Sequence, residues 1–132
     1  MGRRYNMMTI VLKDVINSVD VMRDLASRPL RARVAFQTAR LLKEIERAYG
    51  DYEEQRRNLV EQFAKKDDNG ELIVDENGNC QLYPDKIEEF NNQYNELINS
   101  SIEVNCEPIN IDSLGDIEFT PTQMAKLEPF MA

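Results

Sequence analysis

The stretch that decides the fold is LRARVAFQTARLLKEIERAYGDYEEQRRNLVEQFA, which occupies residues 30–64. Its apolar residues recur every three or four positions, as on one face of a helix, with gaps at Thr38 and Arg56. They are Leu30, Val34, Leu41, Ile45, Ala48, Tyr52, Leu59 and Phe63. Gly50 is a weak helix former, so a break or kink can occur there. The stretch predicts a helix about 50 Å long whose apolar stripe must pack against something.

A second helix can supply that cover. Residues 65–84 contain two turn signals, DNG at 68–70 and DENGN at 75–79, with strand-like residues after each. The pair Asn77-Gly78 is typical of a type I′ hairpin turn. An amphipathic pattern then runs over residues 85–99. We therefore expect a long helical hairpin of residues 30–64 and 85–99, with a small β-hairpin, residues 65–84, at its tip.

The tip also invites a comparison with a calcium-binding loop. With Gly70 at the sixth position of an EF-hand, Asp67, Asn69 and Glu76 fall on ligand positions. However, Lys65 then stands where the first carboxylate should be, and strand signals lie inside the loop. We interpret the stretch as turns of a hairpin, with no metal and no cofactor.

The two ends of the chain are predicted to pair. Residues 7–12 are strand-like, and Asp14 can cap a helix that runs to about Ala26. Alternation over residues 102–106 indicates a second short strand. Thr120 can cap a last helix that starts at Pro121.

The fold class expected is α+β, mainly α, with the helical hairpin and a short terminal β-pairing. Residues 1–132 are predicted to form a single domain, in which residues 1–8 are a disordered extension and residues 65–84 are the hairpin tip.

The net charge of −8 is unevenly distributed. Residues 1–66 hold fourteen Lys/Arg and nine Asp/Glu, a net charge of +5, and residues 67–132 hold two and fifteen, a net charge of −13. The acidic half argues against direct nucleic-acid binding, because phosphates would be repelled. It leaves open binding to a basic protein surface, including one that normally holds nucleic acid.

Composition also bears on chemistry and location. The chain has no histidine and two cysteines, and it contains no phosphate-binding or nucleophile motif, so we expect no enzyme activity. A carboxylate- and metal-dependent enzyme is a remaining hypothesis, but no acid pair can be named for it. No apolar run is long enough for a membrane span, and no signal peptide is evident, so we expect an intracellular site of action.

Two groups of residues are candidates for binding a partner. The first is basic and is either a solvated helix start or a docking patch for an acidic partner. It comprises Arg28, Arg31 and Arg33, with Arg40 and Lys43 farther along. The second is an apolar hook, which either packs on the protein's own core or docks into a neighbour. It comprises Met124, Leu127 and Phe130, with Met131 beside them.

The order of segments resembles a family of small bacteriophage and prophage proteins of unknown function, from tailed phages of Gram-positive hosts. The resemblance rests on LKDVIN at 12–17, SRPLRARVAFQTARLLKEIE at 27–46, KKDDNGELIVDENGN and DKIEEFNNQYNELIN at 65–79 and 85–99, and IDSLGDIEFTPTQMAKLEPF at 111–130. It covers about residues 9–130. The resemblance implies a phage-encoded accessory protein with no agreed active site, so it assigns no site residues.

These observations support two hypotheses. The first is a non-enzymatic accessory protein that acts by protein contact in virion (tail) assembly or structure, located in the host bacterial cytoplasm and associated with the virion. Its partner would be a phage structural protein. The alternative is an inhibitor of a host anti-phage system, for example a CRISPR-type nuclease, that blocks a nucleic-acid-binding groove with its acidic surface. A homo-oligomer is also expected, because a long helix with one apolar stripe often needs a partner chain.

Overall fold

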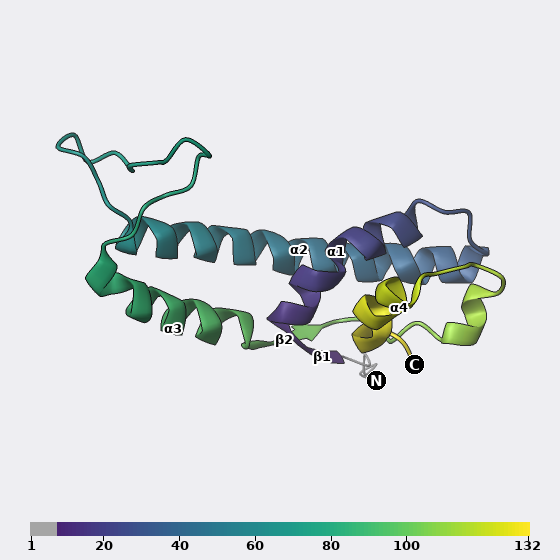
Figure 1. The fold of residues 1–132 in the computed structure, drawn as a ribbon. Coiled ribbons are helices and arrows are strands. Elements are labelled where there is room, and N and C mark those ends of the chain that lie inside the picture. Colours follow the sequence, from purple (N-terminus) through teal and green to yellow (C-terminus); the bar gives the residue numbers. More distant parts are fainter. Residues whose placement is uncertain (1–7) are drawn as a thin grey trace. The chain divides into compact units, whose positions relative to one another are not determined.

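The computed structural model describes residues 8–132 (Figure 1). The strands are β1 (Met8–Val11) and β2 (Ser101–Val104), and the helices are α1 (Leu12–Ala26), α2 (Ala32–Phe63), α3 (Ile87–Ile98) and α4 (Pro121–Leu127). Short 3₁₀ turns occur at Pro84–Lys86, Ile111–Leu114 and Glu128–Phe130. The predicted class, α+β and mainly α, is confirmed.

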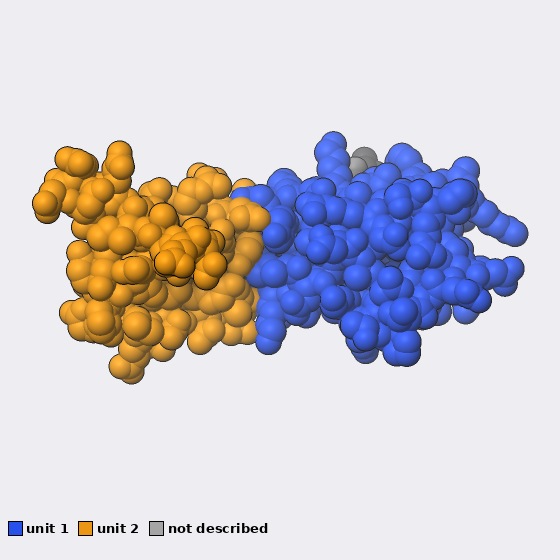
Figure 2. Space-filling model, turned by 45° about the horizontal axis from the view of Figure 1, so that its top comes forward, with its two compact units in different colours: residues 1–50, 100–132 blue, residues 51–99 orange. Residues whose placement is uncertain are grey.

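The chain forms two compact units (Figure 2). Unit 1 comprises residues 1–50 and 100–132, and unit 2 comprises residues 51–99. The single domain expected from the sequence stays a prediction. Of the expected extension at residues 1–8, residues 1–7 lie outside the described part, and Met8 is already the first residue of β1.

In unit 1 the predicted terminal pairing is present. β1 and β2 are antiparallel, with Met8 opposite Val104 and Val11 opposite Ser101. α1 begins directly after β1, and the Leu12 amide donates a hydrogen bond of 2.8 Å to the Ser100 carbonyl. The prediction that Asp14 caps α1 was therefore wrong, because the helix begins at Leu12, two residues before Asp14, with Val11 at the cap position and no side-chain cap hydrogen bond. Asp14 lies in the first turn of the helix instead.

The core of unit 1 is made by α1, the first half of α2, α4 and the segment after β2. Side chains from all four are fully buried, and they include Met22, Leu25, Leu41, Ile45, Ile109 and Leu127; Phe130, in the 3₁₀ turn after α4, is buried with them. Thr38 fills the gap that interrupts the apolar stripe of α2, and only 1% of it is exposed. Its Oγ1 has no hydrogen-bond partner. The helical period thus continues through Thr38, whose methyl group suits an apolar face.

A charged contact joins α1 to α2 within unit 1. The Arg23 guanidinium donates from Nη2 to Glu46 Oε1 at 2.6 Å and from Nε to both carboxylate oxygens at 3.1 Å. Such a fork fixes direction as well as distance, because the planar guanidinium matches the carboxylate.

The C-terminal end of unit 1 is held by backbone bonds. The Ile109 carbonyl accepts a hydrogen bond from the Ala132 amide at 2.8 Å, and the Ile109 amide donates to the Phe130 carbonyl at 2.9 Å. The predicted cap of α4 is confirmed, since Thr120 Oγ1 accepts from the Gln123 amide and Gln123 Oε1 accepts from the Thr120 amide. These reciprocal bonds satisfy two amides that the start of a helix leaves free.

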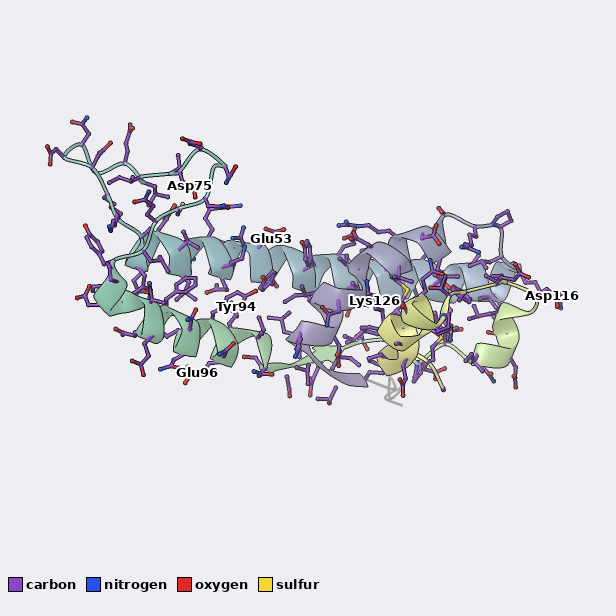
Figure 3. The ribbon with its side chains drawn as sticks, in the orientation of Figure 1. Glu53, Asp75, Tyr94, Glu96, Asp116 and Lys126 are labelled. Atoms are coloured by element: carbon purple, nitrogen blue, oxygen red, sulfur yellow. The ribbon has the colours of Figure 1, made fainter. Side chains whose placement is uncertain are left out.

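In unit 2, α2 continues and α3 returns along it in the opposite direction. α2 is one unbroken helix from Ala32 to Phe63, so no break occurs at Gly50. The Tyr52 and Tyr94 hydroxyls lie 2.7 Å apart, and the Phe63 ring meets the Phe90 ring edge-on at 6.1 Å. Figure 3 shows Tyr94 directed from α3 toward α2. The predicted helical hairpin is therefore present in unit 2, formed by residues 51–63 of α2 and by α3.

The segment between these helices forms a closed ring of isolated β-bridges and backbone hydrogen bonds, without a regular strand. Lys65 donates to the Gln81 carbonyl at 2.7 Å, Ile73 to the Lys65 carbonyl at 3.0 Å, and Gln81 to the Ile73 carbonyl at 3.1 Å. Antiparallel bridges join Ala64 to Leu82, Lys66 to Leu72 and Val74 to Cys80. The last of these is the pairing of the predicted hairpin, and the other two close the ring. Equivalent positions are eight residues apart, so the expectation from the sequence that the chain has no internal repeat was wrong for this segment.

The two turns of the ring have the same design. Gly70 and Gly78 have φ of +81° and +80°, and no other described residue of the turns has positive φ. The type I′ turn predicted at Asn77-Gly78 was therefore wrong, because that turn needs positive φ at both positions. Instead, the Gly78 amide donates to the Asp75 carbonyl at 3.0 Å, as in a type I turn followed by a left-handed glycine.

Candidate functional site

The structure places the predicted basic residues in two different settings. Arg28 is half-buried, and its guanidinium donates to Asp24 Oδ2 at 2.9 Å and to the Glu118 carbonyl at 3.4 Å. It also lies over the Phe119 ring at 5.6 Å. Arg31 and Arg33 are exposed. Arg28 thus ties the end of α1 to the segment before α4, while Arg31 and Arg33 face solvent.

The predicted apolar hook lies in the core of unit 1. Leu127 and Phe130 are 0% exposed, and Met124 is half-buried. Lys126, on the same helix, is exposed (Figure 3). The hook could contact a partner only if α4 left the unit, so its role in partner binding stays a prediction.

A longer basic surface runs along α2 in unit 1, and we call it the basic stripe. Its members are Arg33, Phe36, Arg40, Lys43 and Arg47. They follow one another at spacings of three and four residues, so they share one face of the helix. All five are exposed, and 67% of Phe36 is accessible. Arg33, Arg40 and Lys43 were predicted from the sequence as members of a basic group. Phe36 was not, although its helical spacing from the arginines was a usable signal.

The basic stripe is only partly neutralised within the chain. The Arg40 guanidinium lies 5.9 Å from the centre of the Phe36 ring, and Arg47 pairs with Glu44 at 3.2 Å. Among the described residues, Arg33 and Lys43 form no ion pair. A cation beside an exposed ring suits a partner that offers both carboxylates and apolar groups.

Folding redistributes the charge that the sequence divides into two halves. Unit 1 combines the basic first segment with the acidic C-terminal one and contains eleven Lys/Arg and eleven Asp/Glu, a net charge of zero. Unit 2 contains five Lys/Arg and thirteen Asp/Glu, a net charge of −8. The whole net charge of the protein therefore lies in unit 2, and the acids between residues 67 and 118 do not belong to a single unit.

The Asp67 and Asp75 carboxylates at the two turns accept hydrogen bonds from backbone amides. Asp67 Oδ1 accepts from the Asn69 and Glu71 amides, each at 2.9 Å, and Asp75 Oδ1 accepts from the Asn77 and Asn79 amides at the same distance. These are the bonds that favour aspartate at the start of a turn. Within residues 8–132, no group of three or more Asp, Glu, Cys or His is arranged to hold a metal ion.

Unit 2 also exposes apolar side chains among its acids. Val74 is 54% exposed, Ile87 43% and Tyr83 42%, and they account for three of the five large apolar side chains that are exposed in the described chain. The Lys65 ammonium lies 5.8 Å from the centre of the Tyr83 ring. A surface that is both acidic and apolar can bind a protein through charge and through burial of apolar area.

The two cysteines differ in environment. Cys106 is buried and Cys80 is half-buried in the ring of unit 2. Burial raises the pKa of the Cys106 thiol, Arg40 lowers it and Glu44 raises it, with a net upward shift. A raised pKa keeps the Cys106 thiol protonated and therefore weakly nucleophilic.

The fold and these surfaces define a small, mainly helical α+β protein with a neutral unit and an acidic unit. The chain belongs to the family described as "Protein of unknown function (DUF1617)", whose model matches residues 6–118. No curated protein and no solved structure matches the chain. The resemblance to a family of unknown function is thus confirmed, and the family model ends before α4.

The sequence predicted that the chain has no membrane-spanning segment, and the lengths and apolar character of the helices bear on this prediction. Within residues 8–132, no helix combines the length and the apolar character needed to cross a membrane. The absence of a cofactor and of enzyme activity, and the exclusion of nucleic acid as a direct partner, stay predictions.

Proposed function

We propose that the protein is a non-enzymatic accessory protein of bacteriophage origin that acts by protein contact in virion assembly, at the tail. The observation that carries the proposal is the surface of unit 2. It has a net charge of −8, and it exposes Val74, Tyr83 and Ile87 among its acids. When a partner covers exposed apolar groups, the burial stabilises the complex by about 25 cal/mol per Å² of apolar surface.

The phage part of the proposal rests on the sequence resemblance. It implies that the protein is made in the host bacterial cytoplasm and that it meets a phage structural protein there or in the virion. A basic surface on that structural protein would suit unit 2, because complementary charge accelerates encounter and fixes orientation.

The charge of unit 2 also supports a second function, inhibition of a host anti-phage system. A net charge of −8 on one compact unit could compete with nucleic acid for a basic groove, as in a CRISPR-type nuclease. The two functions differ in how much of the binding free energy comes from charge. An inhibitor that replaces nucleic acid depends mainly on charge, whereas the assembly contact also uses apolar burial.

The test is a pull-down of the tagged protein from lysate of phage-infected host cells, at low and high salt, with mass spectrometry of the bound proteins. An apolar variant, Val74→Ser with Tyr83→Ser, and an acid variant with Asp68→Asn, Glu76→Gln and Glu88→Gln are compared with the wild type. Ile111→Ser is the matched control, since Ile111 is 48% exposed in unit 1.

Tail or baseplate proteins that remain bound at high salt and are lost with the apolar variant would support the assembly function. A host nuclease that is lost at high salt and with the acid variant would support the inhibitor. If the wild type recovers no protein beyond those bound by the apolar and acid variants, contact through unit 2 is refuted.

A further inference from the structure

We propose that the basic stripe of α2 binds unit 2 of a second copy of the chain. The contact joins two different surfaces, the stripe on unit 1 of one copy and the acidic, apolar surface on unit 2 of the other. It shares unit 2 with the proposed function, but it requires no other protein.

The stripe has the composition of a docking surface. Phe36, 67% exposed, is the most accessible of the large apolar side chains that are exposed in the described chain. It lies between Arg33 and Arg40 on one helix face, and the Arg40 guanidinium is 5.9 Å from its ring. An exposed aromatic ring among cations is costly to leave uncovered and typical of the centre of an interface.

Unit 2 of another copy offers the complement to both properties. Its excess of eight acids can pair with the stripe, and its exposed Val74, Tyr83 and Ile87 can cover Phe36. Nucleic acid is the other anionic occupant that the stripe could attract. It is the poorer complement, because its phosphate backbone offers no apolar surface to cover Phe36, which is 67% exposed. A second copy brings carboxylates together with the apolar surface that the phosphate backbone lacks.

A contact between unlike surfaces has a specific consequence. Each copy carries one stripe and one unit 2. A copy that is bound through one of these surfaces can therefore bind a further copy through the other, unless two copies make both contacts with each other. A copy with a damaged stripe retains a competent unit 2, and a copy with a damaged unit 2 retains a competent stripe. Two such defective copies should therefore bind each other, although neither binds itself.

The experiment measures the mass of the purified full chain by sedimentation at about 50 mM and about 500 mM NaCl, since exposed charges are screened over this range. The stripe variant is Arg33→Glu with Lys43→Glu. The unit 2 variant is Asp68→Asn with Glu76→Gln and Glu88→Gln. The matched control is Lys13→Glu with Lys126→Glu, which changes the net charge as the stripe variant does, at two exposed positions outside the stripe.

The wild type and the control should exceed the monomer mass of 15.3 kDa at low salt and approach it at high salt. The stripe variant and the unit 2 variant should each remain at 15.3 kDa alone and should form a complex when mixed. Circular dichroism of each variant confirms that it is folded, and only folded variants are mixed.

A wild type that is monomeric at low salt would overturn the proposal, as would a mixture that stays monomeric. Equal association of the stripe variant and the control would place the contact elsewhere. If duplex DNA binds the wild type but not the stripe variant, and no self-association occurs, the stripe has a nucleic-acid partner and the proposal is wrong. The two proposals fail separately. A lysate pull-down that recovers no partner does not contradict self-association, and a monomeric protein does not contradict the proposed function.

Discussion

The Tyr52 and Tyr94 hydroxyls meet at 2.7 Å and join α2 to α3 inside unit 2. Tyr52 is 7% exposed and Tyr94 is half-buried, so this hydrogen bond is partly shielded from water. The same two rings are 6.4 Å apart in an edge-on arrangement, and Tyr94 stacks on Phe90 at 6.2 Å. The aromatic cluster is therefore a specific contact between the two helices of the unit 2 hairpin.

Loss of one hydroxyl should weaken this contact. Tyr94→Phe keeps the ring and removes a hydrogen bond, so the free energy of unfolding should fall by about 0.5–1.5 kcal/mol. Urea unfolding measures the change. Tyr83→Phe is the control, because Tyr83 is 42% exposed, and it should have almost no effect. Equal losses in the two variants would show that the hydroxyl pair contributes nothing specific.

The glycines of the chain should respond to alanine in opposite directions. Gly78 has φ of +80°, a conformation that disfavours a side chain, so Gly78→Ala should reduce stability by about 1 kcal/mol. Gly50 lies inside α2, and an added Cβ would meet no atom within 4 Å. Gly50→Ala should therefore increase stability by about 1 kcal/mol, because alanine favours the helix. Thermal and urea unfolding of both variants distinguish the signs, and a gain for Gly78→Ala would contradict the turn geometry.

The helices were predictable because their signals are local. The apolar period of α2 and the Thr120-Gln123 capping box of α4 depend on residues that are close in the sequence. The start of α1 was not predictable in this way. Its first amide donates to the Ser100 carbonyl, which is distant in the sequence, so the local pattern around Asp14 did not show that the helix begins at Leu12.

The ring of unit 2 and the net charge of unit 2 could not be predicted from the sequence for a different reason. Lys65, Ile73 and Gln81 occupy equivalent positions but share no side-chain chemistry, because only their backbones form the ring. The repeated letters DDNG and DENG, eight residues apart, were the one visible trace of the repeat. Similarly, the charge of the halves of the sequence did not give the charge of the folded units, because residues 100–132 return to unit 1.

Because the apolar hook lies in the core of unit 1, substitutions in it should destabilise the fold. Leu127 and Phe130 are fully buried, so Leu127→Ala should lower the free energy of unfolding by about 2–5 kcal/mol. Ile111→Ala is the control and should change it by less than about 0.5 kcal/mol, since Ile111 is 48% exposed. Urea unfolding measures both. A Leu127→Ala variant as stable as the wild type would mean that the hook is free to dock into a partner.

The raised pKa of the Cys106 thiol predicts how stability depends on pH. An unfolded thiol ionises near pH 8.5, whereas the buried thiol retains its proton to higher pH. Above about pH 8.5 the folded state therefore binds more protons than the unfolded state, and the free energy of unfolding decreases as pH rises. Below that pH both states hold the proton, so this contribution is fully present. Cys106→Ala removes the titrating group and should lessen the loss of stability between neutral and alkaline pH.

Thiol labelling provides an independent measurement of the same environment. In the native protein Cys80, which is half-buried, should react with a disulfide reagent before Cys106 does. The Cys106→Ala variant should lose the slow phase, and Cys80→Ala should lose the fast one. Because the thiolate is the reacting form, the slow phase should accelerate as pH rises through the raised pKa. A native protein whose two thiols react at the same rate would show that unit 1 does not shield Cys106, and the predicted pH dependence of stability would then fail with it.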